Sequence, residues 1–101
     1  MNRVRLEILS WLAETTCEQV ANGGVILEQD FGENDTVKDV ICQLSARYPR
    51  FGSLVFDVRA QRLTEAVCIL INGHHLELAN GLDTKLSDGD VLTFVPPMEG
   101  G

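Results

Sequence analysis

The chain has 101 residues, of which 45% are hydrophobic and 23% charged, enough for one domain with a single modest core. The longest apolar stretch, VCILI at 67–71, is far shorter than the ~20 residues of a membrane-spanning helix, and the first residues lack the apolar core of a secretory signal, so we expect a cytoplasmic protein with no membrane partner. A net charge of −7 argues against nucleic-acid binding, which depends on cations, and favours a partner with a basic surface.

The chain begins with an alternating pattern. Val4, Leu6 and Ile8 are separated by charged residues, which is typical of a strand with one buried face. A polar connection over residues 10–24 leads to the apolar trio 25–27, which we predict as a second strand, antiparallel to the first.

The pattern then changes to a helical period. Thr36 and Asp39 form a variant of the capping box at its start, with Asp35 as an alternative cap. Arg47 suits the last turn, and Pro49 prevents smooth continuation. The apolar residues of this helix recur at i, i+3, i+4, i+7 and i+11: Val37, Val40, Ile41, Leu44 and Tyr48.

The second half of the chain contains several short elements. Residues 51–66 have no clean period, and we expect a loop with a short turn of helix or strand. VCILI at 67–71 predicts a strand covered on both sides, and the Asn72-Gly73 turn predicts a hairpin whose returning strand is 76–78. Turns at 80–81 and 87–90, where Asp88 and Asp90 are expected to be turn formers, precede a last strand at 91–95.

This order of elements predicts an α+β domain, with a mixed sheet of about five strands and one main helix packed on one face. In the last strand, Leu92 and Phe94 share one side and Val91 and Val95 the other. If the helix covers Leu92 and Phe94, the two valines lie on the open face, which is a candidate docking surface.

The cysteines, histidines and large aromatic residues, which often form catalytic or metal sites, do not predict such a site in this sequence. Cys17, Cys42 and Cys68 are widely spaced and form no C-x-x-C pair, so we predict reduced structural thiols that behave as small buried residues. His74 and His75 are adjacent and on a strand would point to opposite faces, so we predict no metal site. Trp11 and Tyr48 are predicted to be packing residues rather than stacking platforms.

The C-terminal third resembles a known family. LSDGDVLTFVPPMEGG resembles the closing segment of MoaD/ThiS-type sulfur carriers, which are ubiquitin-like β-grasp proteins, and VCILINGHHLELANGLDTKL is also similar to that branch. The Pro96-Pro97 pair is most similar to the small subunit of molybdopterin synthase. The resemblance covers roughly residues 67–101 and implies a β-grasp domain at 1–95 and a flexible tail at 96–101.

The resemblance also implies the chemistry. An adenylating enzyme would activate the α-carboxylate of Gly101 with ATP, so this chain itself would bind no cofactor. A sulfur donor enzyme would convert the adenylate to a thiocarboxylate, and the large subunit of molybdopterin synthase would use that sulfur to build the dithiolene of the pterin. The chain would then be a sulfur-carrying co-substrate and not an enzyme by itself.

The tail residues suit such a role. Gly100 and Gly101 lack a Cβ and can pass a narrow channel, while Pro96 and Pro97 end the strand and direct the chain away from the sheet. Six residue steps from Val95 reach roughly 20 Å when extended. We therefore predict that the partner-binding residues are those of the last strand and the stem: Val91, Val95, Pro96, Pro97, Met98 and Glu99.

Three alternatives remain. The same tail would serve a ubiquitin-like modifier joined to lysines of other proteins, and the presence of only Lys38 and Lys85 weakly disfavours self-linked chains. Sulfur delivery to thiamin, cysteine or a tungsten-containing pterin is the second. A plain binding module, in which deletion of the tail is harmless, is the third.

Overall fold

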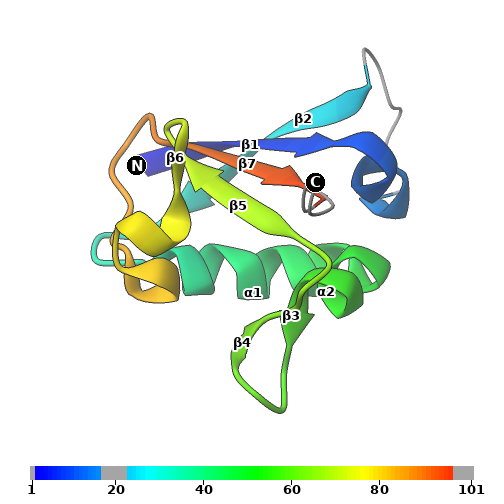
Figure 1. Ribbon diagram of the computed structural model, residues 1–101. Coiled ribbons are helices and arrows are strands. Elements are labelled where there is room, and N and C mark those ends of the chain that lie inside the picture. The colour runs from blue at the N-terminus through cyan, green and yellow to red at the C-terminus, as the bar shows by residue number, and fades with distance from the viewer. Residues whose placement is uncertain (1, 17–22, 97–101) are drawn as a thin grey trace.

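A mixed sheet with helices on one face forms the body of the protein (Figure 1). The computed structural model describes residues 2–16 and 23–96. The five-stranded sheet has the order β2-β1-β7-β5-β6. Its strands are β1 (Asn2–Leu9), β2 (Gly24–Phe31), β5 (Cys68–Ile71), β6 (His74–His75) and β7 (Val91–Val95). The main helix α1 (Val37–Arg47) crosses one face and is followed by the shorter helix α2 (Pro49–Val55).

The pairing of β1 with β7 is parallel, with Leu6 opposite Leu92 and Ile8 opposite Phe94. The other pairs, β1 with β2, β5 with β7 and β5 with β6, are antiparallel. The first and last strands of the chain therefore lie side by side at the centre of the sheet. This arrangement confirms the predicted α+β domain with a mixed sheet.

The core lies between the sheet and the helices. Leu92 and Phe94 of β7 are fully buried on the side that α1 covers, as the alternation predicted. The Phe94 ring meets the ring of Phe51 from α2 edge to face, at a centroid distance of 5.3 Å. The helix α1 contributes four buried side chains: Val37, Val40, Ile41 and Leu44.

The ends of α1 follow the local sequence signals. The backbone N–H of Thr36 donates to Oδ2 of Asp39 at 2.8 Å, and the N–H of Asp39 donates to Oγ1 of Thr36 at 3.4 Å, which completes the predicted capping box. Pro49 occupies the first turn of α2, where its missing N–H costs nothing. It therefore ends one helix and begins the next.

The second strand is longer than the predicted residues 25–27. It runs to Phe31 because the alternation continues past the apolar trio, with Gln29 on the helix-facing side. The amide of Gln29 donates from Nε2 to Oε1 of Gln43 at 2.7 Å, so a helix side chain satisfies a polar group that interrupts the apolar pattern.

The returning strand of the last hairpin was predicted at 76–78, and this prediction is wrong. Asn72 and Gly73 both have positive φ, 50° and 86°, which is typical of a two-residue type I′ turn. In such a turn the returning strand begins at the very next residue. It is therefore β6 at His74–His75, and Leu76–Leu78 form the 3₁₀ turn η2.

The two segments without clear patterns contain helices and a hairpin. Ser10–Thr16 form the 3₁₀ helix η1, which buries Leu12 and Ala13. Trp11 is 45% exposed, so its predicted packing role is wrong, whereas Tyr48 is buried. Residues 51–66 contain most of α2 and a two-stranded hairpin of β3 (Phe56–Asp57) and β4 (Arg62–Leu63).

One further 3₁₀ turn, η3 (Gly81–Asp83), lies beside η2 under the β5–β6 side of the sheet (Figure 1). Within residues 2–16 and 23–96, no helix has the length and apolarity needed to cross a membrane.

Candidate functional site

The last strand, β7, lies at the centre of the sheet and presents two valines away from the helices. We call the sheet face opposite α1 the outer face. Val91, Thr93 and Val95 alternate with buried Leu92 and Phe94, so they lie on this outer face, and each is half-buried. This is the placement predicted for Val91 and Val95.

The D-G-D turn fixes the start of β7 against β1. The N–H of Arg3 donates to Oδ1 of Asp88 at 2.8 Å, and the N–H of Ser87 donates to Oδ2 of Asp90 at 2.8 Å. Gly89 between them has φ of 90°, a conformation that favours glycine. Asp88 and Asp90 are therefore turn formers, as predicted.

Asn72 fixes the same end of β7 against β5. Its Oδ1 accepts from the N–H of Val91 at 2.9 Å, and its Nδ2 donates to Oδ1 of Asp90 at 3.1 Å. The hairpin turn and the D-G-D turn are thus joined through one side chain. Val91 also pairs with Arg5 of β1, so the first residue of β7 is held between its two neighbouring strands.

The far end of β7 is bordered by apolar and weakly polar side chains. Cys68 is the direct partner of Val95, and Leu70 is the partner of Thr93; directly opposite side chains share a face. We call these four residues the exit patch, since the tail continues from it through half-buried Pro96. The predicted cover on both sides of 67–71 is wrong, because Cys68 and Leu70 are only half-buried.

The opposite side of the outer face is charged. Arg3 forms ion pairs with Asp30 at 3.1 Å and with Glu28 at 3.3 Å, and Arg5 pairs with Glu7 at 3.4 Å. The hydrogen bond and the charge of Asp30, reinforced by Glu28, raise the pKa of Arg3. The outer face therefore changes from paired charges on β1 and β2 to the exit patch on β5 and β7.

The proposed tail chemistry falls outside the described residues. Pro97, Met98, Glu99, Gly100 and Gly101 are not described, so their predicted roles stay predictions. The structure adds Cys68, Leu70 and Thr93 to the surface predicted from Val91 and Val95. The run VCILI at 67–71 is apolar throughout, so neither its exposed face nor its register against β7 could be read from the sequence.

The only described histidines lie on opposite faces of β6, as predicted, since His75 pairs with Leu70 and His74 with Ile71. Across the described ranges, no three His, Cys, Asp or Glu side chains come close enough together to hold a metal ion. The cysteines differ from the prediction: Cys42 is exposed and Cys68 is half-buried, while Cys17 lies outside the described residues.

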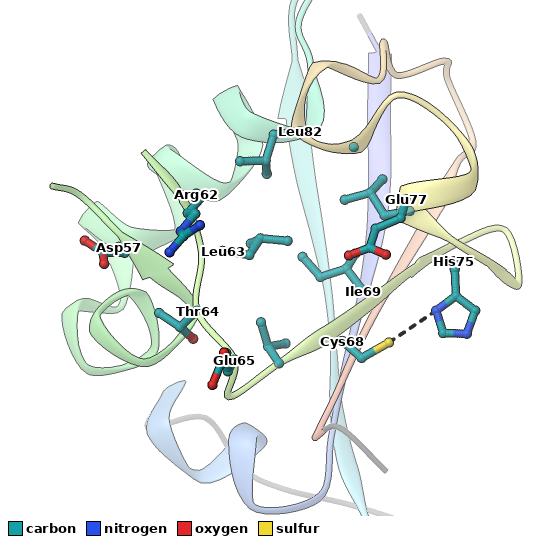
Figure 2. Close-up of a pocket in the computed structure, with 13 residues that line it drawn as sticks. Asp57, Arg62, Leu63, Thr64, Glu65, Cys68, Ile69, His75, Glu77 and Leu82 are labelled. Atoms are coloured by element: carbon teal, nitrogen blue, oxygen red, sulfur yellow. Dashed lines mark hydrogen bonds between the residues drawn. The ribbon is translucent and has the colours of Figure 1, made fainter. Parts of the chain in front are cut away.

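A pocket of about 930 Å³ lies beside β5, between the β3–β4 hairpin and the turns η2 and η3. Cys68 and His75 are among the residues that line it, with Sγ of Cys68 3.5 Å from Nδ1 of His75 (Figure 2). Three acidic residues, Asp57, Glu65 and Glu77, and one basic residue, Arg62, also line it.

Comparison with known proteins agrees with this fold. The model of the ThiS family matches residues 9–101. The sulfur carrier protein CysO of Mycobacterium tuberculosis is 32% identical over 68 residues, 66% of this chain and 73% of that protein.

Two solved structures extend the likeness. Small archaeal modifier protein 1 of Methanosarcina acetivorans is 27% identical with a TM-score of 0.72, covering 100% of this chain and 98% of that one. The structure of the BexX/CysO complex of Amycolatopsis orientalis contains a chain that is 22% identical with a TM-score of 0.73, covering 97% of this chain and 99% of that one. The second likeness shows the fold alone.

Proposed function

The chain belongs to the ThiS family of small ubiquitin-like sulfur carriers, and from this membership we propose that it carries sulfur as a thiocarboxylate on Gly101. The observation that supports this proposal is the end of β7. The strand is held at the centre of the sheet, ends at Val95 within the exit patch, and leads directly into a segment that finishes in two glycines.

The proposed reaction has two steps. The Gly101 carboxylate attacks the α-phosphorus of ATP on a partner adenylating enzyme, so that an acyl adenylate forms and pyrophosphate leaves. A sulfur donor enzyme then supplies sulfur at the sulfide level, which attacks the acyl carbon of the adenylate, displaces AMP and leaves the thiocarboxylate. The folded domain takes no part in bond making, so the chain acts as a co-substrate in the cytoplasm and ATP is bound by the partner.

The exit patch is the proposed docking surface for the adenylating enzyme. Val95, Cys68 and Leu70 offer half-buried apolar surface next to the point where the tail leaves, so an enzyme that covers the patch also receives the tail. The net charge of −7 favours a basic surface on that enzyme. The stem residues Pro96, Pro97, Met98 and Glu99 would follow into its active site.

The acceptor of the sulfur is a separate question. The Pro96-Pro97 stem is similar to the molybdopterin synthase small subunit, which favours the large subunit of that enzyme as partner. The curated relative is a sulfur carrier named CysO, which favours sulfur delivery to cysteine as the alternative. Copurification of the native protein with one large-subunit or adenylating enzyme separates these pathways.

A ubiquitin-like modifier is the second candidate function, because a 27% identical relative is named a small archaeal modifier protein. In this case an isopeptide bond would join Gly101 to a lysine of another protein. The same adenylate would be the intermediate, so both functions require the same tail.

Intact-mass measurement of the protein from its native cell tests the proposal. We expect a species in which one C-terminal oxygen is replaced by sulfur, and none of it after deletion of Gly101. Conjugate bands that survive denaturing, reducing electrophoresis and disappear with the same deletion would instead support the modifier. Unchanged cofactor or cysteine synthesis after that deletion would contradict the sulfur-carrier proposal.

A further inference from the structure

Cys68, which also belongs to the exit patch, forms with His75 a thiol–imidazole pair that takes no part in the proposed bond making at Gly101. Cys68 Sγ and His75 Nδ1 are 3.5 Å apart (Figure 2), within the range of a hydrogen bond to sulfur. His75 is the partner of Leu70 in the β5–β6 ladder, and residues two apart on a strand share a face. The pair therefore lies on the outer face, and the two-residue turn fixes its register.

Neither residue of this pair is fully buried. Cys68 is half-buried and His75 is exposed, and both line the pocket of about 930 Å³ beside β5. In contrast, Cys42 is an exposed thiol on the helix α1, whereas both histidines of the chain lie in β6. Of the two thiols that the structure describes, only Cys68 thus has an imidazole beside it.

We propose that Cys68 is a thiol–disulfide exchange site in which His75 accepts the thiol proton. In the Nε2–H tautomer of His75, the Cys68 S–H donates to Nδ1. As Sγ attacks one sulfur of a disulfide R–S–S–R, the proton passes to Nδ1 and the bond between the two reagent sulfurs breaks. A mixed disulfide forms on Cys68, and the leaving R–S⁻ takes the proton from His75. Cys68 is oxidised and the leaving sulfur is reduced, so the incoming disulfide is the oxidant.

The pocket favours a cationic disulfide. Three carboxylates, Asp57, Glu65 and Glu77, against one guanidinium, Arg62, give the lining of the pocket an excess of negative charge, and Cys68 belongs to the same lining. Like charges repel an anionic reagent such as glutathione disulfide, whereas cystamine is attracted. This inference concerns Cys68 alone and does not depend on the tail chemistry proposed above.

The test compares the two thiols in the full-length chain. In a Cys17→Ser background, Cys42→Ser leaves only Cys68, and Cys68→Ser leaves only Cys42. The rate of mixed-disulfide formation with cystamine is followed by intact mass. We expect Cys68 to react roughly tenfold faster than Cys42, less than the ~10²–10⁴-fold of an enzyme's positioned base because His75 is exposed.

Two histidine variants identify the proton acceptor. His75→Gln is expected to lower the rate at Cys68 roughly tenfold, while His74→Gln, the adjacent residue on the other face, leaves it unchanged. Both positions are exposed, and circular dichroism checks that each variant is folded. Equal rates for His75→Gln and the parent, or an equal loss in His74→Gln, would overturn the proposal.

Glu77→Gln tests the charge preference. It is expected to lower the cystamine rate about twofold, because one nearby negative charge is removed, and to leave the rate with the neutral 2-hydroxyethyl disulfide unchanged. If both rates fall equally, or if glutathione disulfide reacts with Cys68 as fast as cystamine does, the assignment to cationic disulfides is wrong.

Discussion

The rings of Phe51 and Phe94 meet at an interplanar angle of 74° with their centroids 5.3 Å apart. This edge-to-face contact joins α2 to the central strand β7, and both side chains are fully buried. It holds the short helix under the strand that leads to the tail.

Replacement of Phe94 by alanine tests how much this contact supports the fold. Phe94→Ala removes a fully buried ring and leaves a cavity, so we expect the free energy of unfolding to fall by about 3–5 kcal/mol. Val95→Ala, one residue further on the half-buried outer side, should cost about 1 kcal/mol or less. Urea unfolding measures both, and equal losses would contradict the assignment of the two faces.

The contact of α2 with α1 depends on a glycine. A Cβ on Gly52 would lie 2.6 Å from Cβ and 2.7 Å from Cα of Ser45, so Gly52→Ala is expected to destabilise the protein by about 1–3 kcal/mol through overpacking. Gly32→Ala is the matched control, because its nearest neighbour, Oδ2 of Asp35, lies at 3.6 Å. That change should stay within about 1 kcal/mol of the parent. A Gly52→Ala protein as stable as the parent would show that the two helices separate without cost.

A charge in the exit patch should weaken docking of the adenylating enzyme. Val95→Glu places an unpaired carboxylate in a surface proposed to be covered, so we expect the dissociation constant to rise at least about tenfold. Val58→Glu, at a position that is 73% exposed in the loop between β3 and β4, is the control and should leave binding unchanged. Titration calorimetry with the enzyme measures both variants. Equal affinities would remove the exit patch from the proposed interface.

The tail is expected to matter for chemistry and not for stability. Gly100→Val adds a branched side chain next to the reacting carboxylate, and we expect ATP–pyrophosphate exchange by the adenylating enzyme to fall about tenfold or more. The core residues that the structure describes lie between Val4 and Phe94, so we expect the melting temperature to stay the same. Thermal unfolding and the exchange assay are run on one preparation. A lower melting temperature together with normal exchange would reverse the proposed roles.

Local patterns account for the elements that the sequence predicted correctly. Thr36 and Asp39 are three residues apart and need only one helical turn to complete a capping box, and Leu92 and Phe94 need only the alternation of a strand. The returning strand was misplaced because Leu76 and Leu78 suggested an alternating strand, whereas the positive φ values at Asn72 and Gly73 bring the chain back at His74.

The candidate site was predicted only in part, because some of its residues depend on how strands pair and not on the pattern within one strand. Val91 and Val95 could be assigned to one face from the alternation within β7 alone, and the two terminal glycines can be identified directly in the sequence. Cys68 and Leu70 were predicted to be covered because an apolar run is typical of a fully buried strand. That β5 is covered on only one face follows from its place in the sheet, which the run itself does not reveal.

The sequence by itself determined the strand and helix periods, the capped helix, the D-G-D turn and the di-glycine end, because each depends on neighbours within a few residues. Only the tertiary structure decided that Cys68 lies opposite Val95 and beside His75. These contacts depend on the register between strands, which the Asn72-Gly73 turn and the packing of Ile69 and Phe94 into a common core fix together. A shift of one residue would have turned the thiol toward the helices and left the outer face without it.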